Sequence, residues 1–219
     1  MTGFSTADAR RALVEGSLSE RDVRLPGEPL AQLRMGGLRL VEGPEHVDVV
    51  AWDYGMERIL VRAHSLEEAV NEVVARWREQ PTTARRASRE EYVVWVEEMR
   101  DRARSLAPEL DAGLVVETQL PPGSVIDRFG NLDGFLLFPA GTPMAQRSLP
   151  PDVLDPTRVD HGLTLFGVVR AIDVLAVRAR PAFGQPGGGV MFRLATESDT
   201  VRDLLTRGDL VVLTVGDAP

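Results

Sequence analysis

The sequence predicts an α+β fold, with a small helix-and-strand domain over residues 1–112 and a compact, β-rich domain over residues 113–219. The first half holds strand-like runs followed by two strongly periodic helical segments. The second half is rich in glycine and proline, with short apolar runs between turns. The amino-acid composition changes near Leu120, and the second helix is expected to end just before it, at "SLAPEL". We therefore expect the domain boundary between about residues 108 and 120.

The first half supplies the helices of the predicted fold. Its strand candidates are "LRLVE", "VDVVAWDY" and "RILVRAH", and its helices cover residues 65–80 and 88–106. Each helix opens on a capping box, in which Ser65 precedes Glu68 and Ser88 precedes Glu91. No catalytic constellation is found in this half, which suits an adaptor, a delivery module or a self-inhibiting cap.

The second half supplies most of the strands. The candidates are "GLVVET", "VIDRF", "GFLLF", "LTLFGVV", "VLAVRA", "GVMFRL" and "LVVLTV". A short helix, "SDTVRDLLTRG", ends at Gly208, a residue type that favours helix C-termini.

Composition excludes several classes of protein. The net charge of −8 argues against binding to nucleic acid or to an anionic membrane. No uninterrupted apolar stretch is long enough for a transmembrane helix, and the N-terminus lacks a classical signal pattern. We therefore expect a cytoplasmic protein, or one exported by a specialised secretion system. The absence of cysteine excludes disulfides and thiolate chemistry.

The basic residues are all arginine, which is typical of a GC-rich, actinobacterium-like genome. Any anion must therefore be held by arginine, by backbone N–H groups or by neutral donors, and arginine suits two-point contacts with phosphate. His46, His64 and His161 are too scattered to predict a metal site. The sequence contains no nucleophile elbow and no phosphate-binding glycine loop with a lysine.

Three loops remain as candidates for chemistry: "LPPGSVIDRFG", "GTPMAQRSLPP" and "RPAFGQPGGG". Arg128 and Arg147 lie in the first two, among apolar residues. Arg128, beside Phe129, is either a partner of Asp127 in a salt bridge or a holder of an anionic ligand. The glycine-rich loop is either a ligand cradle or a plain turn between strands.

Together these loops resemble the TNT domain, the family named for the tuberculosis necrotizing toxin. The family pattern is roughly "LPPG-x-x-x-DRFG", then "G-[YF]-L-x-P-x-G-x-P", then "QR-[SA]-LPP", then "W-F-x-QPGGG". The matching residues are Leu120–Gly123, Asp127–Gly130, Pro139–Pro143, Gln146–Pro151 and Phe183–Gly189. The resemblance covers about residues 118–219 and says nothing about residues 1–110.

The resemblance implies hydrolysis of NAD+ or NADP+ at the bond between nicotinamide and ribose, with the dinucleotide as substrate and no cofactor or metal. It also implies a bacterial toxin or effector, with an immunity protein as partner or with separate delivery. The implied catalytic residues are Gln185, Arg147 and Arg128. The implied substrate-binding residues are Phe129, Phe183, Gly184, Gly187 and Thr164.

Three positions depart from the family pattern. Leu136 stands where the family has an aromatic residue, and Ala182 stands where tryptophan is usual. Thr164 stands at the position of the toxin's histidine, which His161 reaches only if the strand register slips by three residues. These departures leave open a degenerate domain that binds a nucleotide or a protein partner without turnover, or an interaction protein.

Overall fold

The structure is a computed structural model that describes residues 4–31, 33–79, 84–150 and 162–216. The chain divides into two compact units, each described here by itself. Unit 1 comprises Met1–Pro81, Asn131–Gly134 and Glu197–Arg202, and unit 2 comprises Thr82–Gly130, Phe135–Thr196 and Asp203–Pro219. Helices and sheets occur in both, which confirms the predicted α+β class. No helix in the described ranges is long and apolar enough to cross a membrane.

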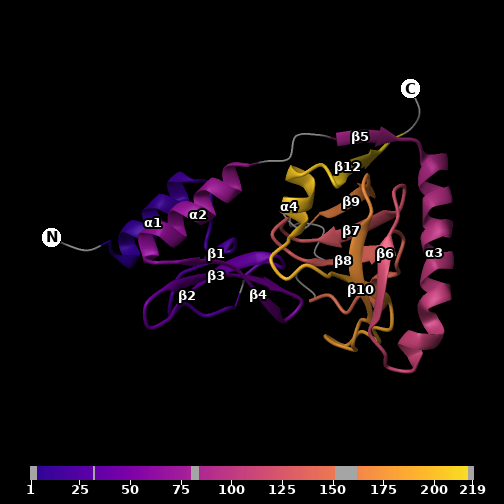
Figure 1. The fold of residues 1–219 in the computed structure, drawn as a ribbon, viewed down its shortest axis with the longest axis horizontal. Helices are drawn as coiled ribbons and strands as arrows, with labels where there is room; N and C mark the ends of the chain where they lie inside the picture. The colour runs from indigo at the N-terminus through magenta and orange to yellow at the C-terminus, as the bar shows by residue number, and fades with distance from the viewer. Residues whose placement is uncertain (1–3, 32, 80–83, 151–161, 217–219) are drawn as a thin grey trace. The chain divides into compact units, whose positions relative to one another are not determined.

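Unit 1 is a four-stranded sheet with two helices on one side (Figure 1). Its elements are α1 (Thr6–Glu15), β1 (Val23–Arg24), β2 (Gly37–Glu42), β3 (Val47–Asp53), β4 (Met56–Ala63) and α2 (Leu66–Arg78). The strands follow sequence order, with β1 parallel to β2 and the others antiparallel. Ser65 caps α2 as predicted, because its side chain accepts from the backbone N–H of Glu68. The buried face of α2 packs on β3 and β4.

Two short segments of the second half of the sequence belong to unit 1, and they are held by a buried cluster around Asp133. Arg202 Nε and Nη2 each donate to this carboxylate at 2.9 Å. Arg76, on α2, donates to the same carboxylate at 2.7 Å and to the Thr200 hydroxyl at 2.6 Å. The Arg202 guanidinium also lies over the ring of Trp77. Helix α2 therefore shares its buried charges with residues 131–134 and 197–202.

Unit 2 is built around an eight-stranded sheet, in the order β5-β12-β9-β7-β8-β11-β10-β6. Its strands are β5 (Ala84–Ala87), β6 (Val116–Leu120), β7 (Val125–Phe129), β8 (Leu136–Pro139), β9 (Leu163–Val168), β10 (Ile172–Arg178), β11 (Val190–Leu194) and β12 (Leu210–Val215). The remaining elements are α3 (Arg89–Asp111) and a 3-10 turn at Met144–Gln146. Helix α4 (Val201–Thr206) begins in unit 1, with Val201 and Arg202, and continues in unit 2 from Asp203. Most neighbouring strands are antiparallel, and β5 lies parallel to β12 at an edge.

Helix α3 runs alongside the sheet of unit 2 and contacts β6, β7, β8 and β10 (Figure 1). Trp95 and Val96 of this helix pack on a buried cluster that includes Val125 of β7. Alternate residues of a strand share a face, so α3 covers the face of β7 that also carries Asp127 and Phe129. All residues of β7 are buried, because both of its faces are covered.

The division into units differs from the boundary that the sequence predicts. The change in composition near Leu120 predicts that α3 belongs to the first domain, residues 1–112, whereas the structure places α3 in unit 2. The reason is packing, because α3 buries its apolar face on strands that follow it in the sequence. The strand before it, β5, also pairs with β12 near the C-terminus.

Candidate functional site

Asp127 and Arg147 form a buried ion pair at the centre of the motif residues. Arg147 Nη2 donates to Asp127 Oδ2 at 2.8 Å, Nη1 donates to Oδ1, and Nε donates to the backbone carbonyl of Thr142 at 2.8 Å. The guanidinium carbon lies 5.0 Å from the ring centre of Phe138 and 5.7 Å from that of Phe129. This arrangement joins the DRFG strand to the QRSLPP loop.

The ion pair is shielded from solvent, with Asp127 0% and Arg147 2% exposed. Burial raises the pKa of the Asp127 carboxyl above its usual value, while hydrogen bonds from Arg147 and the Gly141 backbone N–H act against this rise. Such a pair is costly to separate, because either charge alone is left in an apolar interior. In this structure Arg147 therefore holds the loop in place.

Arg128 lies on the other face of β7, since neighbouring residues of a strand point in opposite directions. It is 0% exposed, and its Nη1 donates to the backbone carbonyl of Leu136 at 3.0 Å. Thr164 of β9 is its register partner across the sheet. The structure thus brings Thr164 beside Arg128 but separates Arg128 from Asp127. The sequence hypothesis of an Asp127–Arg128 salt bridge is wrong in its partner, because Arg147 takes that place.

The side-chain amide of Gln185 pairs with the backbone of Leu149. Gln185 Nε2 donates to the Leu149 carbonyl at 2.8 Å, and Gln185 Oε1 accepts from the Leu149 N–H at 3.3 Å. The Gln185 backbone N–H closes a turn by donating to the Ala182 carbonyl at 2.9 Å. We call the paired Gln185 amide and Leu149 backbone the amide clamp. It ties the glycine-rich loop to the QRSLPP segment.

The glycines after Gln185 allow this loop to lie close to its neighbours. Gly187 has a φ of +66°, and a Cβ built on it would lie 2.6 Å from the Ala179 carbonyl oxygen and 2.8 Å from Ser148 Oγ. Any side chain here would force the loop away. Gly184, with a φ of +73°, has open space where a Cβ would lie. Phe183 is 59% exposed, so its ring is accessible to a ligand.

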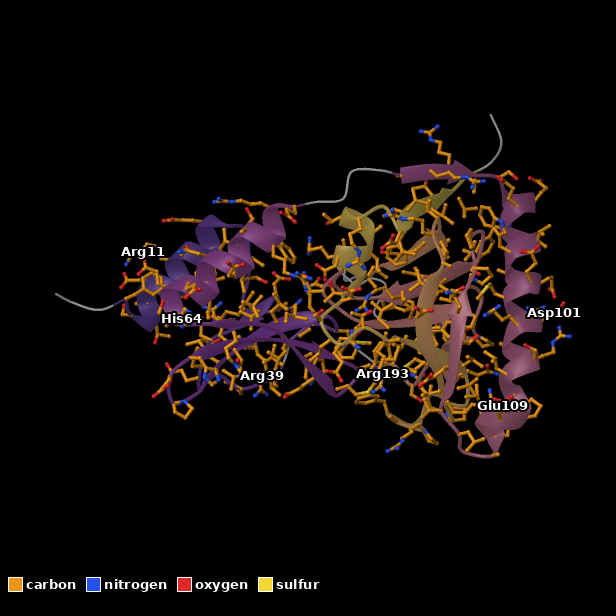
Figure 2. All side chains as sticks on the ribbon, in the orientation of Figure 1. Arg11, Arg39, His64, Asp101, Glu109 and Arg193 are labelled. Carbon is orange, nitrogen blue, oxygen red and sulfur yellow. The ribbon has the colours of Figure 1, made fainter. Side chains whose placement is uncertain are left out.

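A groove of about 280 Å³ lies between α3 and the motif loops. Its lining comes from Arg100, Ala103, Arg104 and Ala107 of α3, the loop 139–143, Gln146, Arg178, Gly189 and Val190. Each arginine of the groove has an acidic partner: Glu97 for Arg100, Asp101 for Arg104 and Asp111 for Arg178. Figure 2 shows Asp101 on the side of α3 away from the sheet. Because these acids are largely exposed, their ion pairs can exchange for an anionic ligand at little cost.

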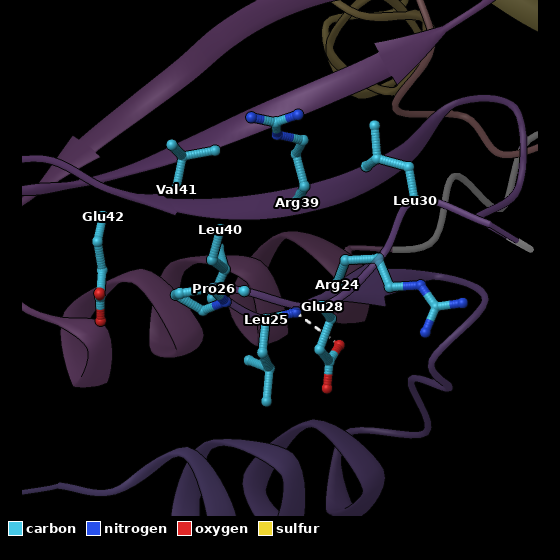
Figure 3. Close-up of a pocket in the computed structure, with 10 residues that line it drawn as sticks. Arg24, Leu25, Pro26, Glu28, Leu30, Arg39, Leu40, Val41 and Glu42 are labelled. Atoms are coloured by element: carbon cyan, nitrogen blue, oxygen red, sulfur yellow. Dashed lines mark hydrogen bonds between the residues drawn. The ribbon is translucent and has the colours of Figure 1, made fainter.

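A second pocket lies within unit 1, between residues 25–30 and β2, and has a volume of about 300 Å³ (Figure 3). Two acidic residues, Glu28 and Glu42, line it, and Glu28 accepts a hydrogen bond from the Leu25 N–H at 2.9 Å and is paired with Arg10. No motif residue lines it. The groove of unit 2 is therefore the better candidate site.

Three features of the site were not predicted from the sequence. These are the partner of Gln185, the ring of Phe138 beside Arg147, and the arginines of α3. One signal was available, since an aspartate within the apolar run "VIDRF" indicates a buried charge that needs a partner. His161 and Pro151 lie outside the described residues. No group of acidic or histidine side chains suited to a metal ion occurs in the part that the structure describes.

Comparison with known proteins gives one family. The model of the tuberculosis necrotizing toxin (TNT) family matches residues 119–213. No curated protein matches the chain.

Two solved structures are similar to parts of it. One is tuberculosis necrotizing toxin complexed with its immunity factor IFT, with 21% identity and a TM-score of 0.33 over 43% of this chain and 54% of that chain. The other is Tse6 in complex with Tsi6, with 16% identity and a TM-score of 0.31 over 54% of this chain and 96% of that chain. The chain thus spans about half the length of the first of these chains.

The family match includes the DRFG, QRSLPP and QPGGG segments within a single range. It confirms, for the C-terminal half of the chain, the resemblance to the TNT domain family.

Proposed function

We propose that this protein is a bacterial toxin that hydrolyses NAD+ or NADP+ and releases nicotinamide. The observation that carries the proposal is the family match over residues 119–213, which takes in every motif segment of the candidate site. The groove beside these segments supports it, since arginines of α3 and β10 surround a hollow lined by motif loops.

The reaction suits a site that has no acid pair. The bond between C1′ of ribose and the pyridinium nitrogen breaks, and its electrons neutralise the pyridinium, so that nicotinamide leaves without needing a proton. Water forms the new bond to C1′ and gives up its proton to solvent, which yields ADP-ribose or its 2′-phosphate. The barrier lies in positive charge on the ribose ring, and positioning and electrostatics can lower it.

The residues divide between contact and support. We assign Gln185 to the ribose hydroxyls or the attacking water, because an amide orients both without titrating. Phe183 is exposed and suits stacking against a flat ring, while Gly184, with open space beside it, lets the sugar approach. Gly187 instead lets the loop pack against Ala179 and Ser148. Arg100, Arg104 and Arg178 suit the phosphates. Arg128 and Arg147 are buried, so they position β7 and the QRSLPP loop, with Phe129 and Thr164 beside them.

We propose an immunity protein as the partner of this toxin. Both similar structures are complexes, one of them of a toxin with its immunity factor. A cell that makes a toxin of this kind needs such a partner or a separate route of delivery. We therefore also propose export by a specialised secretion system.

The direct test is nicotinamide release from NAD+ and, separately, from NADP+, followed by chromatography. Gln185→Ala should lower turnover by about 100-fold or more, as does removal of one donor positioned at a reacting centre. Gln119→Ala is the matched control, because Gln119 is an exposed amide that contacts Asp173. Melting temperatures should accompany the assay, since Gln185→Ala also leaves the Leu149 backbone without its partner. Full turnover by Gln185→Ala would exclude the role of Gln185.

A second candidate is a domain that binds a dinucleotide without turnover. It is favoured by Thr164 at the position of the family's histidine and by the engagement of Gln185 with Leu149. Calorimetry separates the two candidates. Binding of NAD+ or NADP+ without release of nicotinamide would establish the second.

A further inference from the structure

Ser148, next to the amide clamp, has two energetically unfavourable features, one in its backbone and one in its side chain. Its backbone is left-handed, with a φ of 54°, which is unfavourable for a residue with a Cβ. Its side chain is 6% exposed, and its Oγ has no hydrogen-bond partner among the described residues. A buried hydroxyl without a partner loses its hydrogen bonds to water and gains nothing in return. Strain and an unpaired polar group at one residue suggest a functional cause.

Ser148 lies where it can influence Gln185. The next residue, Leu149, forms the backbone half of the amide clamp. The Oγ of Ser148 also faces Gly187 of the glycine-rich loop. It lies 2.8 Å from the position that a Cβ on Gly187 would take. Phe183, two residues before Gln185, is left-handed as well, with a φ of 52°. Strained residues therefore occur in both segments that the clamp joins.

The closed clamp fixes the orientation of the amide that the proposed function needs. Gln185 uses one of its two N–H donors and one lone pair of Oε1 on Leu149, so its plane cannot turn while the clamp is closed. Leaving that backbone frees the whole amide to orient a ribose hydroxyl or a water. Both unfavourable features of Ser148 are present while the loops are packed together. Separation of the loops would expose the hydroxyl to water and would allow the backbone to leave the left-handed region. Each feature lowers the population of the closed clamp by about tenfold.

We propose that Ser148 is a positioning residue for Gln185: its left-handed backbone and its buried hydroxyl, which has no partner among the described residues, keep the amide clamp weakly closed, so that Gln185 is released to the ribose of a nicotinamide dinucleotide. The assignment to the ribose rests on the proposed function. The weakness of the clamp does not, and it can be measured without substrate.

The test uses two variants of the full chain. Ser148→Ala removes the hydroxyl and keeps the left-handed cost, while Ser148→Gly removes both. Ser105→Ala, on the exposed face of α3, is the control. The first measurement is hydrogen exchange of the Leu149 amide by NMR, which reports opening of the clamp. We expect exchange about tenfold slower in Ser148→Ala and slower again in Ser148→Gly, with no change in Ser105→Ala.

The second measurement is nicotinamide release. A more stable clamp lowers the fraction of molecules in which Gln185 is free, so kcat should fall in the same order while KM changes little. Faster Leu149 exchange in either variant would overturn the proposal, because the hydroxyl would then be holding the clamp. Slower exchange with unchanged kcat would overturn its role toward Gln185. If the unmodified chain releases no nicotinamide, the proposed function fails, and the exchange data still decide whether Ser148 weakens the clamp.

Discussion

Two buried aspartates, one in each unit, are held in nearly the same way. Asp127 in unit 2 receives a two-point contact from Arg147, and Asp133 in unit 1 receives one from Arg202. Each arginine also lies over an aromatic ring, at 5.0 Å for the Phe138 ring and 5.2 Å for a tryptophan ring. The planar guanidinium explains the shared design, because its edge pairs with a carboxylate while its face packs on a ring.

The two clusters differ in where their residues come from. Asp127 and Arg147 both lie inside the family-matched range, 20 residues apart. Asp133 takes a second arginine, Arg76, from α2, which lies outside that range. The Asp127–Arg147 pair thus lies wholly within residues 119–213. Unit 1, in contrast, contains two short segments from that range, Asn131–Gly134 and Glu197–Arg202. The family match and the structural units therefore do not share a boundary.

The largest effect should come from the cluster with a single cation. Asp127→Ala leaves Arg147 buried without its counter-charge, and we expect a loss of about 3–5 kcal/mol in the free energy of unfolding. Urea unfolding of the full chain measures this. Asp173→Ala is the control, because Asp173 is exposed and should change stability by less than about 0.5 kcal/mol. A small loss in Asp127→Ala would mean that the ion pair contributes little.

The structure also indicates which helices and strands can be predicted from sequence patterns. The helices over residues 65–80 and 88–106 were predictable, because caps and apolar spacing are local signals, and the structure has them as α2 and α3. Helix α1 was not predicted, since its weak pattern buries only Ala9 and Leu13. Strand β5, "ARRA", was not predicted either. It carries no apolar alternation, and it exists because it pairs with β12 far along the chain.

The site follows the same rule. The motif loops could be found by their residues, yet their partners could not. Sequence reasoning placed Arg128 beside Asp127, whereas alternation along β7 turns Arg128 away and lets Arg147 enter from another loop. The partner of Gln185 is a backbone group, and no residue type identifies a backbone group in a sequence. Contacts between distant loops depend on strand register, which local patterns do not determine.

A smaller and graded effect is expected in unit 1, because Asp133 keeps one arginine when the other is lost. Arg202→Met removes a two-point contact and should cost about 2–3 kcal/mol. Arg76→Met removes one contact to Asp133 and one to Thr200, and should cost about 1 kcal/mol. Urea unfolding of the two variants, each compared with the unmodified chain, gives the two losses in the free energy of unfolding and hence their ratio. Equal losses would show that the two arginines share Asp133 evenly.

The smallest effect on stability should come from the rim of the groove, where an ion pair is partly exposed. Arg178, which is 28% exposed, pairs with Asp111 and donates to the Gly188 carbonyl at 2.9 Å, so Arg178→Ala should cost about 0.5–1 kcal/mol. The affinity of the Arg178→Ala protein for NAD+ and NADP+ should nevertheless fall about tenfold, because a charge-assisted contact to phosphate is lost. Calorimetry at low salt measures this, with Arg170→Ala as the control, an exposed arginine paired with Asp209. Unchanged affinity in Arg178→Ala would place the phosphates elsewhere. Lower affinity with little loss of stability would mean that, in this fold, the buried arginines stabilise the motif loops and the partly exposed Arg178 holds the ligand.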